Sequence, residues 1–149
     1  MKQQVMLDDD GQEVSQQYGA LPFRLRDGLE ILLITSRETQ RWVIPKGWPM
    51  ERKTPAGAAA TEAWEEAGVK GEVSETSIGA YRYDKVLRKS EVLRCRVDVF
   101  PLRVLVQTIA WPESDQRTVR WTNPEDAAAS VAEPELAQLI RDFAAGYKL

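Results

Sequence analysis

The sequence predicts an α/β protein, in which a mixed β-sheet (the α+β mixed type) is covered by helices on its two faces. Strand patterns precede and follow one alanine-rich helical segment, the longest strand pattern runs from Val92 to Val106, and two further helical patterns close the chain. No internal repeat or linker divides its 149 residues. We therefore expect one domain over residues 17–149, preceded by a flexible N-terminal arm at residues 1–16.

The first half of the chain reads as strands joined by short turns. Residues Tyr18–Arg26 alternate weakly, and Pro22 favours an edge strand or a bulge there. Asp27-Gly28 is a strong hairpin signal, and Leu29–Thr35 follows as a buried strand. A short strand at Trp42–Ile44 then leads into a loop.

The helical segment that follows has clear boundaries. Thr54 is a good N-cap, Pro55 suits the first helical position, and Gly68 suits the exit. The spacing predicts an apolar stripe formed by Ala60, Ala63, Trp64 and Ala67, with Glu62, Glu65 and Glu66 on the opposite side.

The second half returns to strands and ends in helices. Lys70-Gly71 reads as a turn, residues 73–83 as one or two strands, and residues 84–91 as a polar hairpin loop before the long strand. A loop at 111–117, a short strand at 118–121, a helix from Asn123 to about Val131 and a last helix from Glu133 complete the prediction.

Composition excludes several kinds of function. A net charge of −3 and a pI near 5.2 argue against a general nucleic-acid binder. The absence of histidine excludes an imidazole base or a histidine zinc site. Cys95 is the only cysteine, no apolar run spans a membrane, and the polar N-terminus is no signal peptide. These features favour a cytoplasmic protein.

The three helical glutamates have two interpretations. Charge patterning alone favours a solvated helix face. However, Ala58 and Ala59 lie one turn earlier on the same side, where a solvent face would carry longer polar residues. These small residues would let the loop Pro45–Lys53 pack against the carboxylates. Like charges at this spacing repel, so a hard divalent cation bound by oxygen ligands would relieve them.

This segment resembles the sequence motif of the Nudix hydrolases. Residues Gly47-x5-Lys53-x7-Thr61-Glu62-Ala63-x-Glu65-Glu66-x-Gly68-Val69 are similar, without gaps, to the Nudix box G-x5-E-x7-R-E-U-x-E-E-x-G-U. The flanking Trp42–Gly47 is typical of members that act on dinucleoside polyphosphates or diphosphoinositol polyphosphates. The resemblance extends from about residue 17 to the end of the chain.

The resemblance implies an α/β/α sandwich and Mg²⁺- or Mn²⁺-dependent hydrolysis of a pyrophosphate bond in a nucleoside diphosphate-linked or polyphosphate substrate. It implies a metal site formed by Glu62, Glu65, Glu66 and the carbonyl of Gly47. Glu65 or Glu66 is the expected catalytic base, with Glu113 as an outside candidate.

Basic and aromatic residues provide candidate substrate contacts. Ser36, Arg37, Arg41 and Lys46 flank the box, and the resemblance assigns phosphate binding to the Ser36-Arg37 positions. A second basic cluster either binds phosphate or only keeps the protein soluble, and tryptophans either stack on a base or pack in the core. These are Lys85, Arg88, Lys89, Arg94 and Arg96, and Trp42, Trp48 and Trp111.

Three positions depart from the motif. Lys53 and Thr61 replace a Glu and an Arg that usually form an ion pair in the family, and Ala63 is a small version of the aliphatic position. Because both charged partners are missing, we expect a rearranged loop with its metal site retained, and Glu51 partly replacing the missing Glu.

The departures leave alternatives open. One is a catalytically weakened Nudix-fold regulatory protein that binds a nucleotide or phosphate, and another is an acidic-helix interaction domain. The expected partner is a phosphorylated small molecule, with no nucleic acid and no membrane, and the chain is expected to be a monomer or homodimer.

Overall fold

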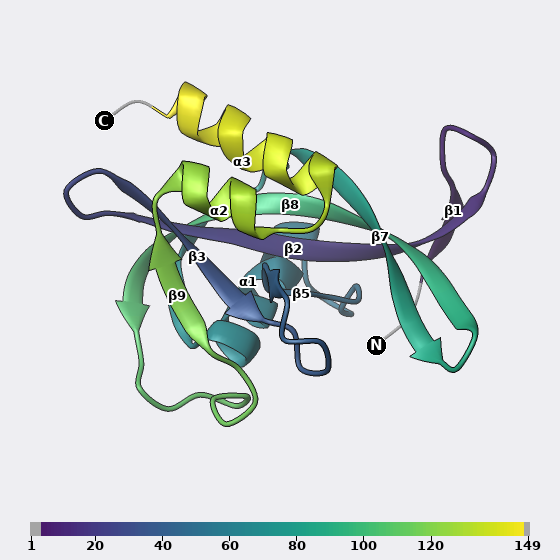
Figure 1. The fold of residues 1–149 in the computed structure, drawn as a ribbon, viewed down its shortest axis with the longest axis horizontal. Coiled ribbons are helices and arrows are strands. Elements are labelled where there is room, and N and C mark those ends of the chain that lie inside the picture. The colour runs from purple at the N-terminus through teal and green to yellow at the C-terminus, as the bar shows by residue number, and fades with distance from the viewer. Residues whose placement is uncertain (1–3, 148–149) are drawn as a thin grey trace.

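The computed structural model describes residues 4–147, which form one mixed sheet and three helices (Figure 1). The helices are α1 (Pro55–Ala67), α2 (Pro124–Ser130) and α3 (Pro134–Gly146). The strands are β1 (Val5–Leu7), β2 (Glu13–Leu25), β3 (Leu29–Thr35), β4 (Trp42–Val43), β5 (Lys46–Gly47), β6 (Val69–Val73), β7 (Gly79–Arg88), β8 (Glu91–Gln107) and β9 (Val119–Thr122).

Strand β2 lies at the centre of the sheet. It runs parallel to β8 from Ser15 to Phe23, and antiparallel to β3 beyond Phe23. The main order is β4-β3-β2-β8-β6, while β7 pairs with β8 and β9 with β3. The short strand β5 pairs with the middle of β2, at Tyr18 and Gly19, which holds the start of the box segment against the sheet.

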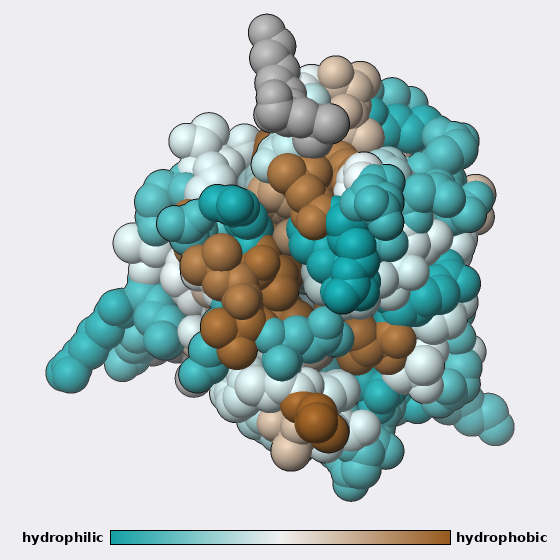
Figure 2. All heavy atoms as spheres, turned by 90° about the vertical axis from the view of Figure 1, so that its left-hand side faces the viewer, coloured by the Kyte–Doolittle hydropathy of each residue, from teal (hydrophilic) through white to brown (hydrophobic). Residues whose placement is uncertain are grey.

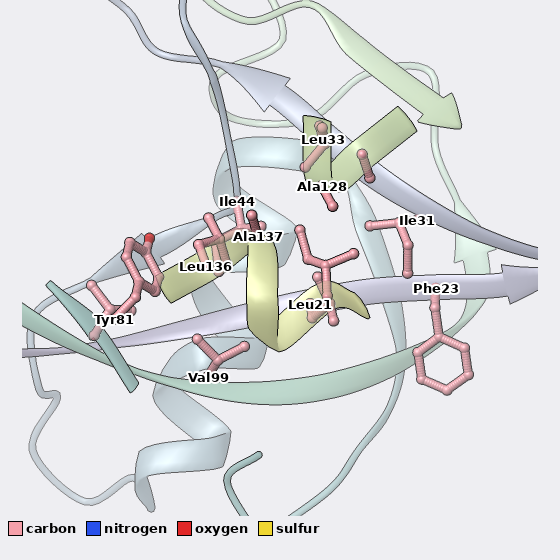
Figure 3. Close-up of a cluster of buried hydrophobic side chains, with 13 residues drawn as sticks. Leu21, Phe23, Ile31, Leu33, Ile44, Tyr81, Val99, Ala128, Leu136 and Ala137 are labelled. Carbon is pink, nitrogen blue, oxygen red and sulfur yellow. The ribbon is translucent and has the colours of Figure 1, made fainter. Parts of the chain in front are cut away.

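Two hydrophobic cores lie on opposite faces of the sheet, which confirms the predicted α/β/α sandwich. In β3, Ile31 and Leu33 face α2 and α3, while Leu32 and Ile34 face α1. Both sets are buried because a strand covered on two sides alternates its side chains between two apolar layers. Figure 3 shows the layer in which Leu136 and Ala137 of α3 and Ala128 of α2 lie against Leu21 of β2.

Helix α1 begins and ends where the sequence predicts. The Thr54 side chain accepts a hydrogen bond from the Gly57 amide at 2.9 Å, and Gly68 adopts a left-handed conformation (φ 72°). The predicted stripe is shifted, however. Ala60 and Trp64 are only half-buried, whereas Ala58, Glu62 and Glu66 are buried beside Ala56, Ala59, Ala63 and Ala67.

The edge position predicted from Pro22 is wrong, because β2 is a central strand. The amide of Ala20 donates to the Pro45 carbonyl at 3.0 Å, on the side where β5 pairs. Pro22, two residues on, faces the same side, between the end of the β5 pairing and the start of the β3 pairing at Phe23. The missing amide of Pro22 therefore interrupts no ladder.

The expected N-terminal arm is part of the sheet where the structure describes it, and residues 1–3 lie outside the described residues. Strand β1 pairs with residues Glu13–Ser15 of β2. The turn between them buries Asp8, whose carboxylate receives Arg82 at 2.8 Å and Arg94 at 3.2 Å. These two arginines, which are far away in sequence, fix a segment that the local sequence pattern predicts to be flexible.

Two turns predicted in the second half are also wrong. Lys70 and Gly71 belong to β6, at a register shift that brings Gly71 close to Arg103 of β8. Residues 84–91 mostly continue β7 and β8, which pair as far as Arg88 and Glu91 around a tight turn at Ser90 (φ 72°). Pairing with the long strand β8 therefore overrides the polar composition of this hairpin.

Hydrophobic side chains gather in patches among hydrophilic ones on the face shown in Figure 2. Several of the exposed large apolar residues lie at or just beyond the ends of β2 and β8: Leu25, Leu105, Val106 and Ile109. None of the helices in the described part of the chain is both long enough and apolar enough to cross a membrane.

Candidate active site

A cavity of about 550 Å³ opens between α1, the β5 segment, the β7–β8 hairpin and the loop before β9. It is rich in charged groups. Its acidic lining is Glu38, Glu62, Glu65, Glu66, Asp84 and Glu113, and its basic lining is Arg37, Arg41, Lys46, Lys85 and Arg117. The cavity therefore joins carboxylates and cations that are widely separated in sequence.

Glu62 and Glu66 are buried at this cavity, each with 7% of its surface exposed. Gly47 lies against Glu62 so closely that a Cβ built on it would come 2.1 Å from Glu62 Oε2. The Lys46 amide points at Glu66 Oε1, 3.4 Å away. The loop through Gly47 thus covers the acidic side of α1, as Ala58 and Ala59 led us to expect, and this side is not a solvated face.

Burial makes this pair of carboxylates electrostatically unusual. Desolvation, followed by the neighbouring Glu66, raises the pKa of Glu62 to about 9. Desolvation also raises the pKa of Glu66, although Lys46 and Arg117 oppose the shift. Two buried acids one helical turn apart therefore retain a proton that an added positive charge would displace.

Arg117 supplies the nearest permanent positive charge. Its Nη2 lies 3.4 Å from Glu66 Oε1 and 3.0 Å from Glu113 Oε1, and its side chain is only 8% exposed. Its Nη1 donates to the carbonyl of Thr35 at 3.0 Å. One guanidinium therefore joins α1, the end of β3 and the loop before β9.

That loop is fastened directly to the end of α1. The Trp111 indole donates to the Glu66 carbonyl at 3.0 Å, the Glu113 amide to the Glu65 carbonyl at 3.1 Å, and the Thr108 amide to the Gly68 carbonyl at 2.9 Å. Carbonyls at a helix end lack intrahelical partners, so the loop satisfies them and brings Glu113 to the cavity.

The residues present fit a divalent cation. Within residues 4–147, no three acidic or cysteine side chains converge on one point in their present rotamers. The pair Glu62 and Glu66 nevertheless offers buried oxygens with raised pKa values, and Gly47, which has no side chain, lets the loop backbone lie directly against Glu62. Hard cations bind such oxygen sets, and burial disfavours the free carboxylates without one.

The four predicted substrate residues all line the cavity. Ser36 and Arg41 are held in a tight turn by the Ser36 hydroxyl, which accepts from the Arg41 amide at 3.0 Å. Arg37 reaches Gln116 at 3.2 Å, and the Lys46 ammonium lies 5.1 Å from the centre of the Tyr83 ring. Desolvation lowers the pKa of Lys46, so an anionic ligand would favour its charged form.

Only Lys85 of the second basic cluster lines the cavity. Arg94 pairs with Asp8 and Asp10, and Arg96 with Asp98. Arg88 pairs with Glu91 across the hairpin turn. These three arginines therefore lie outside the cavity and form ion pairs with the protein's own acidic residues.

The three tryptophans considered for stacking on a ligand have different environments. Trp48 lines the cavity. Trp42 lies under the Arg120 guanidinium, which is 4.2 Å from its ring centre. Trp111 packs against Gly68. Only Trp48 is therefore placed to stack on a ligand in this cavity.

The two main departures from the motif lie on the other side of α1. Lys53 and Thr61 line a separate hollow of about 490 Å³ together with Trp64 and Lys70. The Thr61 hydroxyl donates to the Gly57 carbonyl at 3.0 Å. Glu51 is exposed and forms no ion pair with the described residues, so it does not replace the missing Glu. The substitutions thus lie away from the carboxylate pair.

Sequence reasoning missed Arg117, Gln17 and Tyr83, which also line the cavity. The Tyr83 hydroxyl donates to Gln17 Oε1 at 2.6 Å, which joins β7 to β2. The spacing of Glu113 and Arg117, four residues apart in a loop, was the only local signal for the arginine.

Comparisons with known proteins agree on one family. The model of the NUDIX domain matches residues 16–143. Nudix hydrolase 13, mitochondrial, of Arabidopsis thaliana is 32% identical over 127 residues, which cover 73% of this chain and 63% of that protein. Diphosphoinositol polyphosphate phosphohydrolase 3-alpha of Mus musculus is 34% identical over 110 residues, which cover 72% of this chain and 63% of the relative.

Solved structures show the same fold. An Ap4A hydrolase of C. elegans superposes with a TM-score of 0.60 at 22% identity, covering 89% of this chain and 97% of that one. At this identity the likeness concerns the fold alone. This chain spans less than two thirds of the length of the two sequence relatives.

Proposed function

The chain belongs to the Nudix hydrolase family, and from this premise we propose that it hydrolyses a pyrophosphate bond in a phosphorylated small molecule, with Mg²⁺ or Mn²⁺ as its cofactor. The supporting observation is the buried pair Glu62 and Glu66, which faces Gly47 in a cavity that also contains five basic residues. Buried carboxylates can bind a divalent metal ion, and the surrounding basic groups can bind the phosphates of the substrate.

In this proposal Glu62, Glu66 and the Gly47 carbonyl hold the cation, and Glu65 flanks them on the same side of α1. When bound, the cation neutralises the diphosphate and activates the attacking water. Glu65 or Glu66 accepts a proton as the water oxygen bonds to phosphorus and the anhydride P–O bond breaks. Glu113 is the third candidate for this role, since its carboxylate lies at the same cavity.

The proposed substrate is a dinucleoside polyphosphate or a diphosphoinositol polyphosphate. The printed names of an Ap4A hydrolase and a diphosphoinositol polyphosphate phosphohydrolase among the similar proteins support this class. Lys46, Arg37, Arg41 and Lys85 would contact the phosphates, and Trp48 would stack on a base where there is one.

We do not favour the alternative of a weakened, non-hydrolysing binding protein. That hypothesis depends on Lys53 and Thr61, and both residues lie in the hollow on the far side of α1 from Glu62 and Glu66. The presence of Lys53 and Thr61 therefore removes the ion pair usual in the family, but it removes neither carboxylate of the Glu62 and Glu66 pair.

A pyrophosphatase screen with each cation tests this function. The panel contains dinucleoside polyphosphates, diphosphoinositol polyphosphates, ADP-ribose, nucleotide sugars and nucleoside triphosphates. We expect cation-dependent turnover of one class, lost in Glu66→Gln by a factor of about 10³ or more. Glu75→Gln, an exposed glutamate outside the cavity, is the matched control and should retain wild-type turnover. Turnover by Glu66→Gln at the wild-type rate would refute the site assignment.

We also propose a reducing, cytoplasmic setting and a monomer or homodimer. The single thiol, Cys95, is buried and free. Cell fractionation and light scattering of the purified protein test these two points.

A further inference from the structure

We propose that Arg117 is a positioning residue of this active site: it holds Glu113 beside Glu66 and compensates the helix carboxylates while no cation is bound. The proposal rests on the proposed function for its effect on turnover. Its effect on cation binding is measured without any substrate.

The contacts of Arg117 assign this role. Its Nε donates to Glu113 Oε1 at 3.1 Å and its Nη1 to the Thr35 carbonyl at 3.0 Å, while Nη2 forms ion pairs with Glu113 Oε1 at 3.0 Å and Glu66 Oε1 at 3.4 Å. A planar guanidinium with several fixed N–H groups can contact three groups at once, which a lysine ammonium on a flexible stem cannot do in this geometry. Arg117 therefore determines where the Glu113 carboxylate points.

The Arg117 guanidinium is part of the cavity lining. The side chain of Arg117 is 8% exposed, that of Glu66 9% and that of Glu113 23%, so the three groups interact largely away from water. Charge-assisted hydrogen bonds in such a setting are short and directional. Because the loop backbone is also tied to α1 at the Glu65 and Glu66 carbonyls, Arg117 adjusts side chains on a loop that is already anchored.

Although Arg117 holds the Glu113 side chain in place, its positive charge should weaken the binding of a metal ion. Its Nη2 lies within 3.4 Å of Glu66 Oε1, one of the oxygens proposed to hold the cation. Two positive charges that share one carboxylate repel each other. Removal of the guanidinium charge should therefore strengthen cation binding while it misplaces Glu113 and slows turnover.

The test measures Mn²⁺ binding to the substrate-free protein by titration, together with kcat and KM on the substrate found in the screen. For Arg117→Gln we expect the Mn²⁺ Kd to fall at least about fivefold. We expect kcat to fall about 100-fold with KM changed less than about threefold, because Arg117 contacts two of the candidate bases, Glu66 and Glu113, and a positioned base contributes to the transition state alone. A merely structural role would weaken both binding and turnover.

Three further variants separate charge, geometry and folding. Arg117→Lys keeps the charge and should leave the Mn²⁺ Kd within about twofold of wild type, with kcat about tenfold reduced. The double variant Arg117→Gln/Glu113→Gln should have the kcat of Glu113→Gln alone, since the arginine acts through that residue. Arg120→Gln removes an arginine bound to Ser130 and Trp42 instead, and should change neither Mn²⁺ Kd nor kcat.

Weaker Mn²⁺ binding by Arg117→Gln, or a kcat within about twofold of wild type, overturns the proposal. If Arg117→Gln does not fold, Arg117→Lys decides, and a wild-type kcat in that variant overturns it. If no substrate is turned over by the wild type, the proposed function fails, while the sign of the Mn²⁺ change still tests whether Arg117 compensates the carboxylates.

Discussion

The two sides of helix α1 differ in what covers them. On one side, Glu62 is buried against Gly47, and Glu66 is buried and paired with Arg117. On the other side, Thr61 and Trp64 border an open hollow, and the Lys70 ammonium lies 4.4 Å from the Trp64 ring centre. The two sides are a few residues apart in sequence. The side of Glu62 and Glu66, here called the closed side, forms a close-packed charged site, and the side of Thr61 and Trp64, the open side, is a loosely covered surface.

This contrast explains why departures from the motif need not remove its chemistry. Lys53 and Thr61 change the open side, where no buried charge loses its partner. A comparable change on the closed side would leave a carboxylate buried and uncompensated, at a cost of about 3–5 kcal/mol. Substitutions on the two sides should therefore have very different effects.

Gly47→Ala, on the closed side, should have the largest effect among the variants that compare the two sides. The added Cβ would meet the Glu62 carboxylate, 2.1 Å from Oε2, so either the loop or the carboxylate must move. We expect kcat/KM to fall about 100-fold, since misplacement by 1 Å has this effect on a positioned group. Steady-state kinetics with saturating Mg²⁺ measures it.

Gly57→Ala is the matched control on the open side. Its Cβ would meet Thr54 Oγ1 at 3.2 Å, a contact that a small adjustment relieves. We expect kcat/KM within about twofold of wild type and a gain of up to about 1 kcal/mol in the free energy of unfolding, because alanine favours a helix interior. Equal losses in the two variants would remove the distinction between the sides.

A second prediction concerns the stability of the metal-free protein. The folded-state pKa of Glu62, about 9, exceeds its ordinary value of 4.5. The folded state therefore binds more protons than the unfolded state between these values, so the free energy of unfolding should fall as pH rises through this range. One such proton gives a slope of at most about 1.4 kcal/mol per pH unit.

Urea unfolding in EDTA, from pH 5 to pH 9, measures this slope. We expect Glu62→Gln to reduce it and saturating Mg²⁺ to oppose it, because the cation stabilises the ionised form. A wild-type slope that is unchanged in Glu62→Gln would show that Glu62 is not the group responsible.

A smaller effect is expected from Lys53→Glu/Thr61→Arg, which rebuilds the pair of charges usual in the family. An exposed ion pair contributes about 0–1 kcal/mol, so the free energy of unfolding should rise by no more than that. Turnover should stay within about twofold of wild type. A tenfold rise in kcat would instead show that the departures weaken catalysis.

The smallest effect should come from Lys70→Met, which removes the contact between Lys70 and Trp64 on the open side. An exposed cation–π contact contributes about 0.5–1 kcal/mol, and thermal unfolding should reveal a loss of this size. Lys89→Met, in the exposed turn of the β7–β8 hairpin, is the control for a change of charge alone. An equal shift in both variants would assign no stability to the contact.

The closed side was largely predictable, because its signals are local. The N-cap Thr54, the exit at Gly68, the spacing of the glutamates and the small residues Ala58 and Ala59 all lie within one segment. They predicted the helix and the loop that covers the carboxylates. They did not predict that the buried stripe would include Glu62 and Glu66 in place of Ala60 and Trp64.

The remaining differences come from partners far apart in sequence. Asp8 is fixed by Arg82 and Arg94, which are 74 and 86 residues away, so the expected arm is a paired hairpin up to the described limit at residue 4. Pairing with β8 extends β7 through a polar segment. Arg117 reaches Glu66 only because the loop from Thr108 to Arg117 folds back on α1. No local pattern encodes these contacts.

The most direct test of this account is a Mn²⁺ titration of the wild type, Glu66→Gln and Lys53→Glu/Thr61→Arg, each without substrate. If the closed side alone holds the cation, the wild type and the double variant should bind with Kd values within about twofold of each other. Glu66→Gln should bind at least about tenfold more weakly. Unchanged binding by Glu66→Gln, or binding that appears only in the double variant, would contradict the assignment of the cation site to the closed side of α1.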